Sequence, residues 1–367
     1  MEPFKEHFSP AYVDRLRLRV AECLPSADST VFTGITAPLL NSMELKDRVK
    51  LLAETLVNAI SAPSTEALFD DIVRLAHAEP RWKGFDVWPF TTVLEHYGTL
   101  APSAALKAQK AVTPFFTSEF AVRPLLKDHA ELVLRRFEEW AHDPDEHVRR
   151  WTSEGSRPRV PWGGNFTALI QNPTLTRGIL ETLRDDPAEY VRRSVANHLN
   201  DLTREHPEYV LDVAEEWMYA PGEQTEATLR HALRNLIKAG HPRALALFGS
   251  HKPEILDIRL ELGATDVTVG ESLPWKLRFA TPATAPTQRL VVDYAVWHRK
   301  ANGGLSPKVF KGSVVELAPG KFAVVQRKHS LRPVTTRVYY PGVHELHVMI
   351  NGQTVAKADF TLHLPGE

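Results

Sequence analysis

The sequence contains very little cysteine: Cys23 is the single one among 367 residues. One cysteine excludes an internal disulfide framework and any zinc site that several cysteines would build. The chain also lacks any run close to the roughly 20 consecutive apolar residues that a membrane-spanning helix needs. Its acidic, amphipathic beginning, MEPFKEHFSPAYVDRL, predicts no secretory signal. We therefore expect a cytoplasmic protein.

The sequence as a whole also lacks an excess of positive or negative charge, since it contains 44 Lys and Arg and 45 Asp and Glu. The balance differs between the two parts of the sequence. Residues 258–367 carry 14 basic and 8 acidic residues, whereas residues 1–257 carry 30 and 37. A polyanionic partner is therefore expected for the C-terminal part, and the first part would need a local basic strip to bind one.

Several well-known catalytic motifs are absent. The sequence has no Gly-rich phosphate loop, no HExxH, no GxSxG and no Rossmann glycine pattern. His344 and His347 lie on a predicted strand, where they cannot form the i, i+4 pair of a zinc-binding helix. We predict neither a metal site nor a cofactor.

The periodicity of apolar residues changes once along the chain. From residue 9 to about 247 they recur three and four apart, which predicts helices, and from about residue 258 they alternate, which predicts strands. The clearest helical segments are 46–60, 129–142 and 225–240, and the clearest strands are 258–269, 289–298, 343–352 and 354–364. The change near 249–257 predicts two domains, 1–250 and 258–367. The tyrosines at 339–340 resemble the corner of an immunoglobulin-like fold.

An internal repeat organises the helical part. The octet 143-DPDEHVRR-150 returns as 186-DPAEYVRR-193, and looser copies begin near residues 117 and 224. The octet has the composition of a helix start, with Asp as the cap, Pro in the first helical position and Glu completing a capping box. Predicted helices at 129–142, 174–184 and 207–219 precede these copies. Helix pairs of this kind predict a HEAT-like stack whose second helices line the concave face.

One face of the repeated helix carries a ladder of polar residues. Arg193, Asn197 and Asp201 are four residues apart and lie on one face. The same positions hold Arg150 and Glu154 in the preceding repeat, and His231 and Asn235 in the following one. An isolated helix would carry such residues as solvent-facing ion pairs. Their recurrence on three repeats favours a functional surface.

Two further segments have alternative interpretations. The insertion 155-GSRPRVPWGGNFTALIQNP-173 carries Trp162 between Pro and Gly residues, so this indole either forms a contact platform or fills a gap between repeats. The basic run 326-QRKHSLRPVTTR-337 lies in a predicted β-hairpin. It either protects an edge strand by charge or contacts phosphates, and the basic character of 258–367 favours phosphate contact.

These features together resemble the AlkC family of bacterial alkylpurine DNA glycosylases. The resemblance covers essentially the whole chain and rests on the run DPxEYVRRSVANHLND, the loop RVPWGGN and the C-terminal sandwich. It implies a HEAT-like α-solenoid followed by an antiparallel immunoglobulin-like β-sandwich. It also implies a monomeric base-excision-repair enzyme, acting at the nucleoid without cofactor or base flipping. The implied reaction removes cationic N3-alkylated bases, 3-methyladenine above all and 3-methylcytosine as a further candidate, from double-stranded DNA.

The resemblance also assigns functional residues. It places catalytic carboxylates at Glu119, Glu154 and Asp201, and an aromatic contact to the lesion at Trp162. Carboxylates can stabilise the positive charge that develops on deoxyribose when the glycosidic bond breaks. The polar ladder contains Glu154 and Asp201 independently, whereas Glu119 rests on the resemblance alone. The expected DNA contacts are Arg149, Arg150, Arg157, Arg159, Arg192, Arg193, Asn197, Arg327, Lys328 and Arg332.

Two other functions remain compatible with the sequence. HEAT stacks and immunoglobulin-like domains also serve as non-catalytic scaffolds, and an alkylation sensor would bind damaged DNA without cleaving it. Convergent carboxylates within a basic strip would favour the enzyme, and a broad apolar groove would favour the scaffold.

Overall fold

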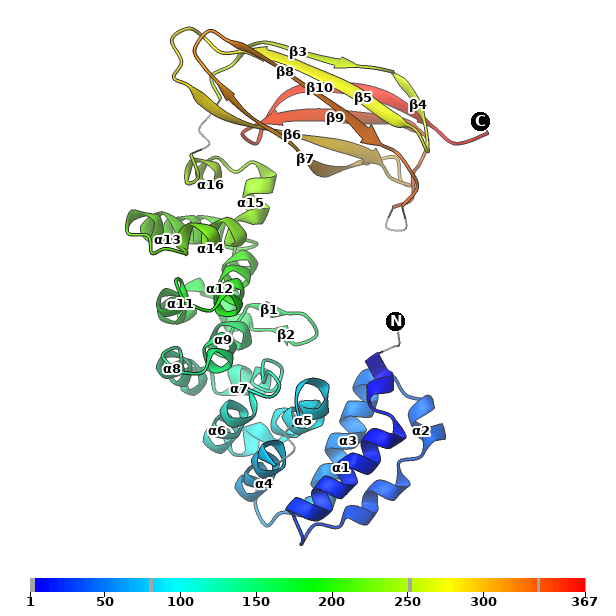
Figure 1. Cartoon of the computed structure of the whole chain (residues 1–367), viewed down its shortest axis with the longest axis vertical. Helices are drawn as coiled ribbons and strands as arrows, with labels where there is room; N and C mark the ends of the chain where they lie inside the picture. The colour runs from blue at the N-terminus through cyan, green and yellow to red at the C-terminus, as the bar shows by residue number, and fades with distance from the viewer. Residues whose placement is uncertain (1–3, 79–81, 250–252, 335–336, 367) are drawn as a thin grey trace. The chain divides into compact units, whose positions relative to one another are not determined.

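The computed structural model describes residues 4–78, 82–249, 253–334 and 337–366 (Figure 1). The backbone packs into two compact units. The first comprises Met1–Val210 with Ala220–Ala232, and the second comprises Leu211–Tyr219 with Leu233–Glu367. The predicted boundary at 250–258 coincides with the change from helix to strand and stays a proposal about domains. Within the described ranges, no helix is both long and apolar enough to cross a membrane.

The first unit is built mainly of helices, as predicted. Its α-helices are α1 (Pro10–Cys23), α2 (Ala37–Asn41), α3 (Leu45–Ile60), α4 (Thr65–His77), α5 (Trp88–Tyr97), α6 (Pro102–Val112), α7 (Arg123–Asp128), α8 (Ala130–Trp140), α9 (Glu146–Gly155), α10 (Thr167–Gln171), α11 (Arg177–Leu183), α12 (Glu189–Leu202) and α14 (Thr225–Ala232). Between α9 and α10, a small hairpin is formed by β1 (Arg159–Val160) and β2 (Gly164–Asn165).

The repeat places corresponding helices side by side. α8 pairs with α9, α11 pairs with α12, and α12 packs against both α9 and α14. In Figure 1, α9 and α12 lie on the inner side of the curve that these helices form, and the β1–β2 hairpin projects from the same side. The prediction that the second helices of the pairs line the concave face is therefore confirmed for α9 and α12, and these two rungs of the polar ladder lie on adjacent helices.

The predicted helix caps are wrong by two residues. The N-cap of α9 is Asp145, whose carboxylate accepts a hydrogen bond from the backbone N of His147 at 2.7 Å. The carboxylate of Asp143 accepts from the backbone N of Asp145 at 2.9 Å, and Asp186 forms the equivalent turn in the second copy. Glu146 is the first residue of its helix, which is too early for a capping box. The Asp-Pro pair therefore shapes the turn that enters the helix.

The arginine of the octet holds that turn in place. Arg149 donates to the carbonyl oxygens of its own Asp-Pro pair at 2.9 and 3.0 Å, and Arg192 does the same at 2.6 and 2.9 Å. Arg149 also donates from Nε to the carboxylate of Asp186 at 2.7 Å, and that side chain is only 4% exposed. The repeated sequence thus encodes a link between successive repeats.

The predicted helix 225–240 is two helices. α14 ends at Ala232 and α15 (Arg234–Ala239) begins after a turn at Leu233. No glycine or proline marks this break in the sequence. Asn235 consequently does not continue the face of α14, and the third rung of the predicted ladder is limited to His231.

The second unit contains the sandwich. Its helices are α15 and α16 (Pro242–Ala246), and α13 (Pro207–Tyr219) begins in the first unit. The strands are β3 (Leu256–Leu262), β4 (Asp266–Thr268), β5 (Ser272–Ala280), β6 (Gln288–Arg299), β7 (Leu305–Leu317), β8 (Phe322–Ser330), β9 (Gly342–Ile350) and β10 (Gln353–His363). They form a five-stranded sheet in the order β4-β10-β9-β6-β7 and a three-stranded sheet in the order β3-β5-β8.

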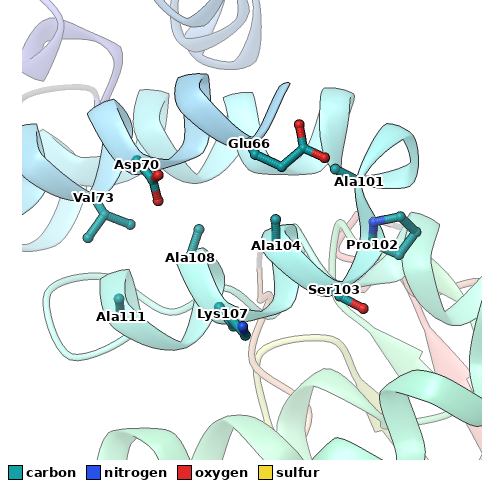
Figure 2. A pocket seen from close by; sticks show the side chains of 10 residues that line it. All are labelled: Glu66, Asp70, Val73, Ala101, Pro102, Ser103, Ala104, Lys107, Ala108 and Ala111. Carbon is teal, nitrogen blue, oxygen red and sulfur yellow. The ribbon is translucent and has the colours of Figure 1, made fainter. Parts of the chain in front are cut away.

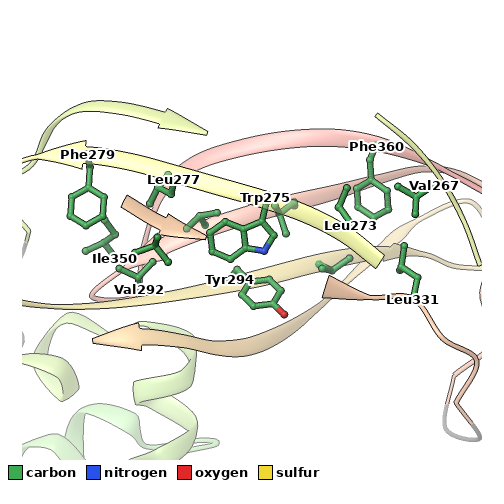
Figure 3. Packing of buried hydrophobic residues seen from close by; sticks show 14 of the residues in the cluster. Val267, Leu273, Trp275, Leu277, Phe279, Val292, Tyr294, Leu331, Ile350 and Phe360 are labelled. Atoms are coloured by element: carbon green, nitrogen blue, oxygen red, sulfur yellow. The ribbon is translucent and has the colours of Figure 1, made fainter. Parts of the chain in front are cut away.

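The two sheets bury a shared apolar core, as predicted for an immunoglobulin-like sandwich. Trp275 and Tyr294 pack together near its centre, with ring centroids 5.1 Å apart (Figure 3). The hydroxyl of Tyr339 donates back to the carbonyl of Arg332 at 3.4 Å, in the manner of a tyrosine corner. The sandwich departs from the predicted antiparallel pattern at one edge, because β4 runs parallel to β10. A bend at Gly263 divides the predicted strand 258–269, so that β3 lies in the three-stranded sheet and β4 in the five-stranded sheet.

The first part of the basic run lies on an edge strand and not in the predicted hairpin, and an antiparallel bridge between Val334 and Arg337 closes its end. β8 pairs with β5 at the edge of the three-stranded sheet, whereas β7 belongs to the other sheet. Arg327 and Lys328 are exposed residues near the end of β8, and Arg332 follows in the loop. Residues 335–336 of this run lie outside the described residues. Both interpretations of the run, edge protection and phosphate contact, remain compatible with this location.

Buried histidines make the sandwich sensitive to acid. Burial and the nearby Arg337 lower the pKa of His298 to about 3, and burial and the same arginine lower that of His329 to about 4. An unfolded histidine titrates near pH 6.5, so the unfolded chain binds more protons than the folded one below that pH. Stability from these groups is fully present above about pH 6.5 and is lost as the pH falls towards 4. We expect a lower Tm at pH 5 than at pH 7 by calorimetry. A Tm that does not change between these pH values would contradict this expectation.

Candidate active site

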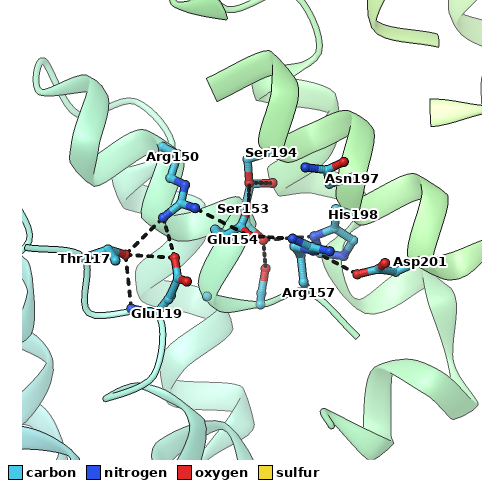
Figure 4. A network of polar contacts seen from close by, with 12 residues as sticks. Thr117, Glu119, Arg150, Ser153, Glu154, Arg157, Ser194, Asn197, His198 and Asp201 are labelled. Carbon is cyan, nitrogen blue, oxygen red and sulfur yellow. Dashed lines mark hydrogen bonds and ion pairs between the residues drawn. The ribbon is translucent and has the colours of Figure 1, made fainter. Parts of the chain in front are cut away.

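Five charged side chains from three segments form an uninterrupted series of ion pairs in which acidic and basic groups alternate (Figure 4). We call this series the charge chain. Glu119 lies in the turn before α7, Arg150 and Glu154 lie on α9, Arg157 follows α9, and Asp201 lies on α12. Arg150 donates to Glu119 at 2.5 Å and lies 3.4 Å from Glu154; Arg157 contacts Glu154 at 2.5 Å and Asp201 at 2.8 Å. Within these five side chains, three carboxylates and two guanidinium groups leave one negative charge in excess; the guanidinium group of Arg123, which interacts electrostatically with Arg157, is not in this count.

Glu154 is the central carboxylate of the charge chain. Its side chain is only 8% exposed, and Ser194 on α12 donates to it at 2.7 Å. Burial alone would raise its pKa, but Arg150 and Arg157 outweigh burial and hold the pKa of Glu154 below its usual range. Glu154 is therefore a fixed negative charge at neutral pH.

Asp201 has the opposite electrostatic environment. Burial raises the pKa of its carboxyl, and the hydrogen bond from Arg157 only partly opposes that effect. Its side chain is 18% exposed, compared with 8% for Glu154. The two carboxylates therefore differ in basicity, although both contact the same guanidinium group.

A neutral, buried histidine connects the helices that carry the charge chain. His198 is completely buried on α12, and its Nδ1 lies 3.0 Å from the carbonyl oxygen of Ser153 on α9. A carbonyl can only accept, so Nδ1 carries the proton and Nε2 accepts from the hydroxyl of Thr176 at 3.1 Å. Burial lowers the pKa of His198 to about 3. This histidine fixes the spacing of α9 and α12.

The loop that carries Trp162 is held by a single arginine. Arg123, at the start of α7, donates to the carbonyl oxygens of Gly155, Arg157 and Gly164 at 2.9, 2.8 and 3.1 Å. Burial lowers its pKa to about 10, so it stays charged at neutral pH. The loop places Trp162 at the tip of the β1–β2 hairpin with 67% of the side chain exposed. An indole this exposed does not fill a gap between repeats.

The remaining predicted residues of this unit lie outside the charge chain. Arg193 is directed to solvent and pairs with Glu189 at 2.5 Å, while Asn197 Oδ1 lies 3.1 Å from His231. Arg159 forms a two-point ion pair with Glu205 at 2.6 and 2.9 Å. The predicted ladder is thus split, because only Asp201 of the three α12 positions reaches the cluster.

Comparison with known proteins assigns the chain to a family. Residues 257–364 match the family profile described as "Uncharacterised protein YhaZ, C-terminal Ig-like domain". The uncharacterized protein YhaZ of Bacillus subtilis (strain 168) is 35% identical over 98% of this chain and 99% of its own length. The Pseudomonas fluorescens alkylpurine DNA glycosylase AlkC, solved bound to DNA containing an abasic site analog, is 33% identical, covers 99% of this chain and 100% of its own, and superposes with a TM-score of 0.82. The chain belongs to the AlkC family.

Several residues of this AlkC-family site were not found by sequence reasoning. Arg123, Ser153, Ser194 and His198 organise the cluster without lying on the predicted ladder. Ser194 and His198 are each one residue beyond a ladder position, on the side of α12 that faces α9. Their spacing of four residues on a helix face was an available signal.

Other hollows of the helical unit are separate from the cluster. A hollow of about 640 Å³ lies between α4 and α6, where Glu66 and Asp70 face a row of alanines (Figure 2). None of its lining residues belongs to the charge chain. In the part of the chain that the structure describes, no group of three or more His, Cys, Asp or Glu residues is arranged to hold a metal ion.

Proposed function

We propose that this AlkC-family chain is a DNA glycosylase that hydrolyses the N-glycosidic bond of cationic N3-alkylated bases in double-stranded DNA. The observation that carries the proposal is the cluster of Glu119, Glu154 and Asp201, in which three carboxylates outnumber the two guanidinium groups that contact them and Glu154 lies on the segment that leads into the hairpin of Trp162. Such a cluster attracts a positively charged lesion. 3-Methyladenine is the primary substrate that we propose, and 3-methylcytosine is the second.

The chemistry needs little from a general acid. When the bond between C1′ and the alkylated base breaks, its electron pair moves to the base and neutralises the positive charge there. Deoxyribose is left as an oxocarbenium-like cation, which the carboxylates stabilise. Water then attacks C1′ and passes a proton to a carboxylate. The products are the free base and an abasic site.

The two carboxylates that contact Arg157 suit different steps. Glu154, whose pKa is held low by two arginines, remains charged and stabilises the cation. Asp201 has a raised pKa and a more exposed carboxylate, so it is the better acceptor for the proton of water. This division of roles assigns water activation to Asp201.

Trp162 and the surrounding arginines supply the contacts to DNA in this proposal. An indole that is 67% exposed can stack on a base or sugar edge and lie against a cationic base. In this proposal the exposed ring is the contact surface for the lesion, which is removed without being flipped into a pocket. Arg193, also exposed, is the clearest candidate on α12 for phosphate contact.

Release of free 3-methyladenine from methylated duplex DNA tests the proposal directly. We expect single-turnover release that is complete in the absence of added metal or nucleotide. Binding of methylated DNA without release would indicate an alkylation sensor. Absence of both binding and release would favour the scaffold.

The basic edge of the sandwich should control DNA affinity. We expect the triple variant Arg327→Gln, Lys328→Gln, Arg332→Gln to bind duplex DNA more weakly and with a shallower salt dependence. Loss of two or three phosphate contacts lowers the slope of log K against log salt by about 0.9 for each contact. Fluorescence anisotropy at several salt concentrations measures both quantities.

The matched control removes the same charge elsewhere on the sandwich. Lys300, Lys308 and Lys311 lie on or beside β7, in the other sheet. If their triple replacement by Gln lowers affinity and slope as much as the first variant, the effect is one of net charge and the edge of β8 has no specific role.

A further inference from the structure

Trp162 occupies a turn position that normally requires glycine. The carbonyl of Val160 accepts from the backbone N of Gly163 at 3.0 Å, which closes a four-residue turn with Pro161 second and Trp162 third. The φ of Trp162 is +69°. A positive φ at the third position, after proline at the second, is the pattern of a type II turn, in which glycine is favoured and a bulky side chain is unfavourable. The strained position presents an indole where a turn would ordinarily have none.

Burial does not offset this strain, because two-thirds of the Trp162 side chain is exposed. The turn is fixed on one side by close packing. A Cβ built on Gly163 would lie 3.0 Å from the ring of Phe120 and 3.2 Å from the Cβ of Val160. The backbone therefore has little room to rearrange on the side of Phe120, and the orientation of the indole depends on contacts on its other sides.

Lys46 makes such a contact from a distant part of the sequence. It lies in the first turn of α3, 116 residues before Trp162. Its Nζ donates to the carbonyl oxygen of Trp162 at 3.3 Å and lies 5.7 Å from the centroid of the indole ring. One ammonium group thus contacts both the strained peptide and the face of the side chain, in a cation–π geometry.

Lys46 and Trp162 both line a small cavity beside α3. Its volume is about 200 Å³, and its lining includes Lys46, Lys50, Glu95, Phe120 and Trp162. Burial raises the pKa of Glu95, whereas the positive charge of Lys46 lowers it. Lys46 therefore interacts electrostatically with a carboxyl group that lines the same cavity. Because the indole borders open space here, a change at Lys46 leaves room for the ring to turn.

We propose that Lys46 is a positioning residue that holds the indole of Trp162 in the orientation used for base excision. This inference rests on the proposed glycosylase activity for its kinetic consequence, but the contact itself can be tested separately. Lys46 acts through Trp162 and is not assigned a contact to the lesion.

The alternative for an exposed lysine is a simple contact to phosphate, and Lys50 is the matched control for it. Lys50 lies one turn further along α3, lines the same cavity and pairs with Glu54 at 3.7 Å. Removing either lysine takes away one positive charge from the same region. A phosphate contact would change affinity and salt dependence, whereas positioning changes the rate at saturating DNA.

The kinetic test compares Lys46→Met, Lys46→Arg and Lys50→Met in single-turnover excision at saturating DNA. We expect Lys46→Met to lower the rate at least tenfold with little change in affinity, Lys46→Arg to recover most of it, and Lys50→Met to stay within twofold of the original. Adding Lys46→Met to Trp162→Ala should cause no loss beyond that of Trp162→Ala alone, because the indole through which Lys46 acts is then already absent. Equal behaviour of Lys46→Met and Lys50→Met, or multiplying effects in the double variant, would overturn the inference.

A second measurement needs no activity. In protein labelled with 5-fluorotryptophan, the resonance of Trp162 is identified by its loss in Trp162→Phe. We expect Lys46→Met to shift or broaden this resonance and Lys50→Met to leave it in place. An unchanged resonance in Lys46→Met would refute the contact. If the original protein releases no base at all, the proposed function fails while this measurement still decides the role of Lys46.

Discussion

Replacing Asp201 by Asn should lower the single-turnover rate of 3-methyladenine release by about a hundredfold, the magnitude expected when one preorganised electrostatic contact to a transition state is lost. Asparagine has the same size and keeps an oxygen that can accept from Arg157, now 2.8 Å from the carboxylate. What it removes is the negative charge and the ability to take a proton from water. Folding should survive, which circular dichroism and a melting curve would verify.

The pH dependence provides a second signature of Asp201. Because burial raises its pKa, the rate should fall as the pH drops through a value above the usual range of aspartate, and this acidic limb should be absent from the residual activity of Asp201→Asn. Glu205→Gln is the matched control, since Glu205 pairs with Arg159 of the same loop but lies outside the charge chain. Unchanged excision by a folded Asp201→Asn protein would remove Asp201 from the mechanism. Glu154→Gln should behave similarly, and the double variant tests compensation between the two carboxylates.

Selectivity for cationic bases is the second large effect that we expect. An N3-alkylated base leaves readily because bond breaking neutralises its charge, and the excess negative charge of the cluster attracts it beforehand. A neutral base such as hypoxanthine needs protonation or enclosure. His198 cannot supply the proton, because it is fully buried and its pKa is about 3. We therefore expect efficient release of 3-methyladenine and negligible release of hypoxanthine from the same duplex position.

The comparison is made in one oligonucleotide sequence, with the released base measured by chromatography. A bulky cationic base at the same position is the informative control. If charge decides, the bulky cation is released faster than the small neutral base. Hypoxanthine release at a rate comparable to that of 3-methyladenine would show that the site contains a proton donor or an enclosure that the charge chain does not provide.

Sequence periodicity was sufficient for the main architecture because it reflects burial. The changes of period correctly separated helices from strands, and the 43-residue offset between the DPxxxVR octets correctly predicted that α9 and α12 are equivalent and adjacent. The octet was misread in detail, since its aspartate was expected to cap the helix and instead shapes the turn before it. The break at Leu233 and the parallel pairing of β4 with β10 depend on tertiary packing. The residue pattern around these positions does not predict either feature.

The candidate site shows where periodicity stops being informative. It placed Arg193 and Asp201 on one face, yet Arg193 pairs outward with Glu189 while Asp201 meets Arg157. A long side chain can choose among several partners, and spacing alone does not decide between them. Glu119 lies in a turn, where side chains follow no regular periodicity. Its place in the candidate site could therefore be inferred only from the family resemblance. Lys46 lies 116 residues from its partner, a contact that only the folded chain reveals.

Arg123 holds the loop that carries Trp162 through the backbone of that loop. Its three hydrogen bonds all end on main-chain carbonyl oxygens, which every residue type provides. These three contacts therefore do not depend on which side chains the loop carries. Arg157 and Arg159 add contacts of their own to Asp201 and Glu205, so a change at either would alter the loop as well as the charge around it. Trp162 is the exposed large side chain of the loop, and exchange there should leave the course of the backbone in place provided that the new residue accepts a positive φ. Exchange of Arg123 would instead release three carbonyl contacts at once.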